Sequence, residues 1–164
     1  MGMTELVRTM VAYNDALHRQ VWESIHQLNN DLFTASIEYS HGSIRNQMVH
    51  LAAVDGRWTR GLKGLPDARC FNPYADDYPT SGSVFDLWDP IAREFCDLTN
   101  SLDDEQLLLA PEGMNEPAWQ IILHVVNHGT DHRAQVLRAL HDFGAPTFNQ
   151  DLIIHLWQAK KESQ

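Results

Sequence analysis

Two histidines, His128 and His132, lie four residues apart near the end of the chain, within the segment Asn127 to Gln135. Side chains at positions i and i+4 of a helix point the same way, so two imidazoles at this spacing can bind one metal ion. A metal held by three protein ligands keeps a coordination position free for water or substrate, whereas four ligands are usual in structural sites. The pair therefore indicates a metal site, and one suited to catalysis if a single further ligand joins it.

Angular positions separate this pair from another histidine on the same predicted helix. With about 100° per residue and Ile121 placed at zero, the apolar stripe of the helix spans about 0° to 60°. His132 then lies at about 20°, His128 at about −20° and His124 at about −60°. We therefore expect His128 and His132 to bind the metal, and His124 to lie beside them, behind the ligands or at the rim.

Periodicity leaves the third ligand open. His50 lies about 120° from Ile44, on the flank of its helix's apolar stripe, whereas Asp55 lies almost on that stripe. A carboxylate facing the core needs a partner because an unpaired buried charge is costly. Arg133, or the N–H of a metal-bound histidine, would provide one. The open candidates are His18, His26, His50, Asp55 and Asp131.

Two other kinds of metal site are disfavoured. A metalloprotease helix carries a glutamate directly after its first histidine, but here Gly129 follows His128. Di-iron bundles need Glu-x-x-His motifs and bridging glutamates from several helices. The motif occurs at Glu23–His26 and Glu38–His41, but no glutamate lies between positions 117 and 143. The late helix therefore cannot supply a bridging carboxylate.

Four long helices are predicted to position these residues. Apolar residues recur every three or four positions in segments of about 4–28, 43–62, 80–102 and 117–143, with a shorter segment at 150–160. Segment 66–79 reads as a loop, and Pro90 indicates either a kink in the third helix or a new helix start at Asp89-Pro90. With no strand-like alternation, we expect an all-α four-helix bundle with a short C-terminal helix, forming a single domain over residues 1–164.

The charge and composition of the chain limit the classes of partner that we expect it to bind. A formal net charge of −10 disfavours nucleic-acid binding, because such a chain repels phosphate backbones. No apolar run approaches the roughly 20 residues of a membrane-spanning helix, so we expect no membrane. The first residues do not resemble a signal peptide, which makes the cytoplasm the expected location. Cys70 and Cys96 form no metal-binding or redox motif and are expected to be plain thiols.

Several short motifs occur along the chain in this order: Tyr13-Asn14, Gly42-Ser43-Ile44, Met48-Val49-His50-Leu51, Trp58, the segment from His124 to Gln135, Gly144 and Asp151-Leu152. Together they resemble the DinB/YfiT-like superfamily of bacterial four-helix-bundle metalloproteins. The segment from His124 to Gln135 is the most specific part, and the similarity covers nearly the whole chain.

This resemblance implies three histidine ligands, His50, His128 and His132, holding one divalent transition metal ion per chain, typically zinc or nickel. Imidazole suits several such ions, so the ligand type does not choose between them. Relatives in the superfamily are thiol-dependent transferases and isomerases that use low-molecular-weight thiols such as bacillithiol or mycothiol. The resemblance thus implies a homodimeric metal-dependent enzyme, a thiol S-transferase or hydrolase, that acts on a small-molecule substrate. The alternative is a non-enzymatic, metal-stabilised dimeric stress-response bundle.

Other polar residues near the expected ligands are candidates for substrate contacts. His124, Asn127 and Asp131 are placed to position a substrate, and Arg133 to bind a carboxylate or to pair with Asp55. Many relatives have a histidine directly before the last ligand, where this chain has Asp131. No nucleophile or general base can be identified from the sequence, so catalytic roles beyond the metal are unassigned.

Overall fold

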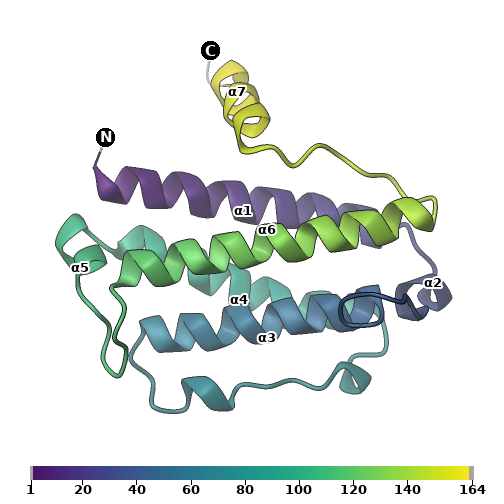
Figure 1. The fold of residues 1–164 in the computed structure, drawn as a ribbon, viewed down its shortest axis with the longest axis horizontal. Helices are drawn as coiled ribbons and strands as arrows, with labels where there is room; N and C mark the ends of the chain where they lie inside the picture. Colours follow the sequence, from purple (N-terminus) through teal and green to yellow (C-terminus); the bar gives the residue numbers. More distant parts are fainter. Residues whose placement is uncertain (1, 163–164) are drawn as a thin grey trace.

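The computed structural model describes residues 2–162, and this range is all-helical with no strand, as the sequence predicted. α1 and α3 each pack against both α4 and α6, so each long helix has two long neighbours. Figure 1 shows the four helices lying side by side. Their bounds are α1 Met3–Ile25, α3 Ile44–Leu62, α4 Ser81–Ser101 and α6 Ala118–Asp142.

Local capping sets most of these boundaries close to the predicted ones. The Ser43 hydroxyl accepts a hydrogen bond from the backbone N–H of Asn46 (3.0 Å) at the start of α3, and Thr80 forms a capping box with Ser83 at the start of α4. Pro117 directly precedes α6, and Gly144, with a φ of +74°, follows its end. The starts of α3, α4 and α6 and the end of α6 are thus set by signals in the local sequence.

The first helix ends earlier than expected. It stops at Ile25, where apolar periodicity had predicted about position 28. The reason lies in Asn29, whose side chain accepts a hydrogen bond from Leu32 N (2.9 Å) and starts the short helix α2, Asn30–Thr34. α4, in contrast, is not interrupted where the sequence allowed an interruption. It runs through Pro90 without a break, so the alternative prediction of a new helix start at Asp89-Pro90 is wrong.

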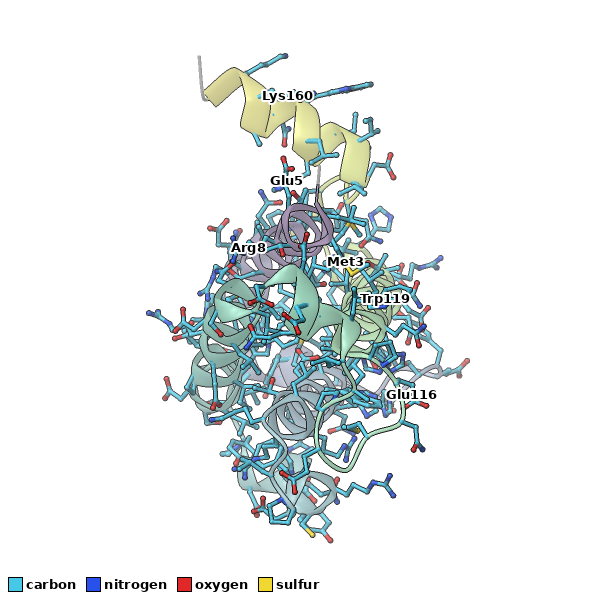
Figure 2. The ribbon with its side chains drawn as sticks, turned by 90° about the vertical axis from the view of Figure 1, so that its left-hand side faces the viewer. Met3, Glu5, Arg8, Glu116, Trp119 and Lys160 are labelled. Carbon is cyan, nitrogen blue, oxygen red and sulfur yellow. The ribbon has the colours of Figure 1, made fainter. Side chains whose placement is uncertain are left out.

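Shorter elements connect the long helices. The predicted loop 66–79 contains two single-turn 3₁₀ helices, η1 Ala68–Cys70 and η2 Ala75–Asp77, and α5 Asp104–Leu108 precedes α6. α7, Leu152–Glu162, corresponds to the predicted C-terminal helix. It lies on the far side of α1 from α3 in Figure 1, and the ring of His155 on it packs edge-on against that of Tyr13 on α1, with 5.5 Å between centroids. Figure 2 shows Lys160 on this helix.

Two apolar clusters form the core, with a belt of polar side chains between them. In α1, Val7 and Val11 belong to one cluster, and Val21 and Trp22 to the other. Buried polar residues occupy the intervening stretches of α1, α3 and α6: Asn14, His18, Asp55, His132 and Arg133. The functional candidates therefore lie at mid-height of the helices. None of the described helices is long and apolar enough to cross a membrane.

Candidate metal site

Three histidines meet where α3 faces α6. The Nε2 atoms of His50 and His128 are 3.3 Å apart. The ring of His132 lies 4.2 Å from that of His128 and 4.8 Å from that of His50, measured between centroids. The residues that the resemblance implied as ligands are thus neighbours in space, from two helices.

The spacing between His50 and His128 suits a shared ion. Two imidazole nitrogens at about 2.0–2.1 Å from one zinc ion, at a tetrahedral angle, lie about 3.4 Å apart. The observed separation of 3.3 Å agrees with that value. In addition, Nδ1 of His128 is buried without a hydrogen-bond partner among the described residues. The donor set and its spacing therefore fit a divalent transition metal ion.

A fourth imidazole, that of His41, reaches the same place. Nitrogen atoms of His41, His50 and His132 all lie within 4.8 Å of one another, and His128 is not a member of this mutually close set. The His41 side chain is exposed, and its ring stacks on that of His50 with 3.9 Å between centroids and 24° between planes. In the sequence His41 stands out only in the disfavoured di-iron motif Glu38–His41, and no pattern predicted its place here.

A tight turn before α3 presents His41. Ser40 has a φ of +57° and Gly42 a φ of +82°, both in the left-handed region. Gly42 N donates to Tyr39 O (3.2 Å), and the side-chain amide of Asn46 donates to the His41 carbonyl (2.9 Å). The backbone at His41 is therefore held by hydrogen bonds, while its side chain stays open to solvent.

Gln47 is a second residue of the cluster that the sequence did not predict. Its side-chain nitrogen lies 2.8 Å from Nδ1 of His132 and 2.9 Å from Oε1 of Gln135. Gln135 in turn donates to the Asp131 carboxylate (3.2 Å). A metal-binding histidine donates its other ring N–H to an oxygen, so Gln47 orients a metal-bound His132 by presenting its amide oxygen to Nδ1, with the amide turned over relative to this arrangement. The signal in the sequence that could have indicated Gln47 is its place on the buried face of the helix, one helical turn before His50.

The cluster keeps its imidazoles neutral. Burial, and then the neighbouring His41, lowers the pKa of His50 from 6.5 to about 3. Burial, and then His132, lowers the pKa of His128 to about 4. The pKa values of His132 and His41 are also lowered, mainly by burial. Neutral imidazole is the form that binds metal, so protons do not compete for these nitrogens at pH 7.

The neighbours expected around the ligands are spread over the outer face of α6. The exposed ring of His124 packs edge-on against Trp58 with 5.1 Å between centroids, and lies 6.0 Å from the ring of His128. Asn127 and Asp131 are exposed and line, with His124 and His128, a surface hollow of about 500 Å³. Exposure thus increases from His132 through His128 to His124, as the angular positions predicted.

Arg133 does not pair with Asp55, so that expectation is wrong. The fully buried guanidinium donates to Asn14 Oδ1 (2.9 Å), Gln150 Oε1 (3.0 Å) and Thr130 Oγ1 (3.1 Å). It faces α1 and the segment before α7, whereas Asp55 lines a small cavity together with His18. Asp55 Oδ1 has no hydrogen-bond partner within the described residues, and burial raises the pKa of Asp55 to about 7.

The remaining candidates for the third ligand lie elsewhere. His18 is buried in the cavity that Asp55 lines, and His26 stacks on Trp22 with 5.7 Å between centroids.

Cys70 and Cys96 are free thiols, the first exposed and the second half-buried.

A pocket of about 500 Å³ opens beside His128, a volume typical of sites for small molecules. It lies among α3, α6, η1 and the loop before α6. Its lining residues are Val54, Arg57, Trp58, Ala68, Arg69, Met114, Glu116, His124 and His128. The histidine cluster thus has a cavity for a ligand directly at its edge.

Comparison with known proteins finds a family and a named relative over nearly the whole chain. The family model described as "DinB family" matches residues 1–163. The protein named "Protein DinB" from Bacillus subtilis (strain 168) is 21% identical over 170 residues, which cover 98% of this chain and 99% of that relative.

Proposed function

The chain belongs to the DinB family, and on this premise we propose that His50, His128 and His132 bind one divalent transition metal ion per chain. The observation that carries the proposal is the 3.3 Å separation of the His50 and His128 Nε2 atoms, which suits two ligands of one ion. Imidazole ligands favour zinc or nickel over magnesium or calcium. Family membership and the mutual packing of the four long helices support a single four-helix-bundle domain as the scaffold.

We propose further that His41 takes the fourth position while no substrate is bound. Its ring lies against His50 and its nitrogen lies within reach of the cluster. Because the side chain is exposed and comes from a loop, it can leave without disturbing the helices. Departure of His41 would turn a four-ligand site into an open three-histidine site.

The reaction we propose is a metal-dependent transfer of a thiol to a small electrophile, in which a carbon–sulfur bond forms, the thiol proton passes to water and a leaving group such as chloride departs. A divalent ion at these histidines supplies Lewis acidity, which lowers the pKa of a thiol or water. The residues of the chain itself orient the ligands, keep them neutral and hold the small molecule. Gln47 orients His132, burial keeps the imidazoles unprotonated, and the cavity beside His128 holds the small molecule near the cluster. His124, Asn127 and Asp131 line the second hollow next to His128 and are proposed to contact the thiol or the electrophile.

Metal analysis tests the first proposal. Protein purified without a histidine tag is expected to carry about one ion per chain, and His50→Ala and His128→Ala to lose it. His124→Ala is the matched control, because it removes an imidazole from the same helix outside the cluster. Wild-type protein without metal, whose melting temperature does not change on adding zinc or nickel, would contradict the proposal.

Spectroscopy of the cobalt-substituted protein tests thiol transfer. Cysteine, glutathione, bacillithiol and mycothiol are each added, and we expect one of them to alter the visible spectrum and to form a conjugate with 1-chloro-2,4-dinitrobenzene. If the metal binds but no thiol changes the spectrum, transfer is wrong. A metal-stabilised, non-enzymatic bundle then becomes the better description.

We also propose that the protein is a homodimer. On α7 the side chains of Ile153 and Trp157 remain 50% and 54% exposed, which is unusual for large apolar residues close together on a short helix. A second copy covering them would remove this surface from water. Light scattering after gel filtration is expected to give twice the chain mass, and Trp157→Ala to shift the protein toward monomer. A monomeric wild-type protein contradicts this proposal.

A further inference from the structure

Most arginines of this chain are held by ion pairs or close hydrogen bonds to described residues, and two are not. Of the nine arginines, Arg19, Arg45, Arg60, Arg93 and Arg138 form ion pairs with aspartates. Two more are occupied by neutral groups, since Arg8 donates to backbone carbonyls and Arg133 to side-chain oxygens. That leaves Arg57 and Arg69, neither of which forms an ion pair with any residue that the structure describes.

These two arginines line the same pocket, the one that reaches His128. Arg57 is half-buried on α3, and among the described residues its side chain forms one hydrogen bond, a long one of 3.4 Å to the side chain of Asn72. The positive charge of Arg57 also helps to lower the pKa values of His50 and His128 in the histidine cluster. Arg69 lies exposed on η1, and its side chain forms no hydrogen bond within the described part of the chain.

The rest of the lining is mostly apolar. Val54, Trp58 and Met114 supply aliphatic and aromatic surface. The one acidic lining residue is Glu116, an exposed side chain that forms no ion pair with the residues described. Figure 2 shows it on the loop that precedes α6. Two cations against one anion make the pocket positive, in a chain whose formal net charge is −10.

We propose that Arg57 and Arg69 form an anion subsite, which selects small molecules that carry a carboxylate or phosphate on an apolar body. Guanidinium groups bind both anions through charge-assisted hydrogen bonds, and Trp58 with Met114 would cover the apolar part. The ligand's other end then lies at His128. The inference deepens the proposed function, on which it rests for the identity of the reaction, although the subsite itself needs no metal.

Binding of matched probes to metal-free protein tests the subsite. Benzoate and phenyl phosphate represent the two anions, and benzyl alcohol is the neutral analogue; each is titrated by calorimetry. We expect at least one anion to bind about tenfold or more tightly than benzyl alcohol, and R57Q and R69Q each to weaken it by about tenfold, as a lost charge-assisted hydrogen bond implies. R138Q is the control, since it removes the same charge from an exposed site on α6 that does not line the pocket.

The outcomes separate this inference from the metal proposal. Arginine-dependent binding to metal-free protein supports the subsite whatever the metal analysis gives. Equal affinity for benzoate, phenyl phosphate and benzyl alcohol overturns it, as does the absence of binding by either anion. If only zinc-loaded protein binds the anions and R57Q and R69Q have no effect, the ion alone holds them and the subsite is wrong. An equal loss in R138Q also overturns it, because net charge would then explain the binding.

Discussion

The residue on which the geometry of the cluster most depends is Gln47. It is buried and holds Nδ1 of His132 at 2.8 Å. We expect Gln47→Leu, which keeps the volume but removes the amide, to weaken metal binding by about 10- to 100-fold, the usual effect of removing such a partner. Competition with a chromophoric chelator measures the affinity. Gln135→Leu is the control, since it leaves Gln47 facing His132; equal losses in both variants would contradict this role.

A second prediction at the scale of single residues concerns the imidazole of His41. If it occupies the fourth position, His41→Ala keeps about one ion per chain but frees a coordination position. The visible spectrum of the cobalt-substituted variant is then expected to differ from that of the wild type, and its response to an added thiol to begin at lower thiol concentration. Identical spectra and identical thiol responses would place His41 outside the coordination sphere.

Among the residues of the site, the sequence could predict those whose relation follows from local spacing. His128 and His132 are one turn apart on one helix, so their common direction follows from helix geometry. His50 came from family resemblance, because angular position left it on the flank of its helix. His41 and Gln47 meet His132 only through the packing of α3 and the preceding turn against α6. No single-segment pattern encodes that contact.

At the scale of elements, the approach of α6 to α1 depends on Gly129. A Cβ added there would lie 2.6 Å from Asn14 Oδ1 and 2.9 Å from His18 Cε1. Asn14 is also the acceptor for buried Arg133, so it is not free to move. We expect Gly129→Ala to lower the free energy of unfolding by about 1–3 kcal/mol, measured by urea denaturation.

A matched glycine distinguishes crowding from helix propensity. Gly82 lies in the first turn of α4, and its added Cβ would come no closer than 3.9 Å to its neighbour Thr80 Oγ1. Gly82→Ala is expected to be neutral or to stabilise by up to about 1 kcal/mol. If Gly129→Ala behaves in the same way, close packing of α1 on α6 is not what requires the glycine.

The long helices were predictable because each repeats its apolar stripe over five or more turns, and α3 and α4 also begin at side-chain caps. The shorter α2, α5, η1 and η2 were not, since three to five residues are too few to show a period. Two of these matter for function. η1 carries Arg69, and the turn after α2 carries His41, so the parts that complete the pocket and the cluster lie where sequence patterns are weakest.

Across the whole molecule, the buried polar belt makes stability depend on pH in two opposing ways. Burial lowers the pKa of His18 from 6.5 to about 3, as it does for His50. The unfolded chain therefore binds more protons below pH 6.5, and metal-free protein loses stability as the pH falls from about 6.5 toward 3. Asp55 acts in the opposite direction, because burial raises its pKa from 3.8 to about 7.

Replacing Asp55 isolates the second effect. Between pH 3.8 and about 7 the folded protein binds the extra proton at Asp55, so this residue's contribution to stability falls as the pH rises through that range. Asp55→Asn stays neutral and is expected to gain stability relative to the wild type by up to roughly 4 kcal/mol between pH 4 and pH 8. Urea denaturation of both metal-free proteins at each pH measures the difference. The gain should level off above pH 7, because Asp55 is then ionised in both states of the wild type. A difference that stays constant from pH 4 to pH 8 would mean that Asp55 ionises in the folded protein as it does in water, through a partner such as an enclosed water molecule in the cavity it shares with His18.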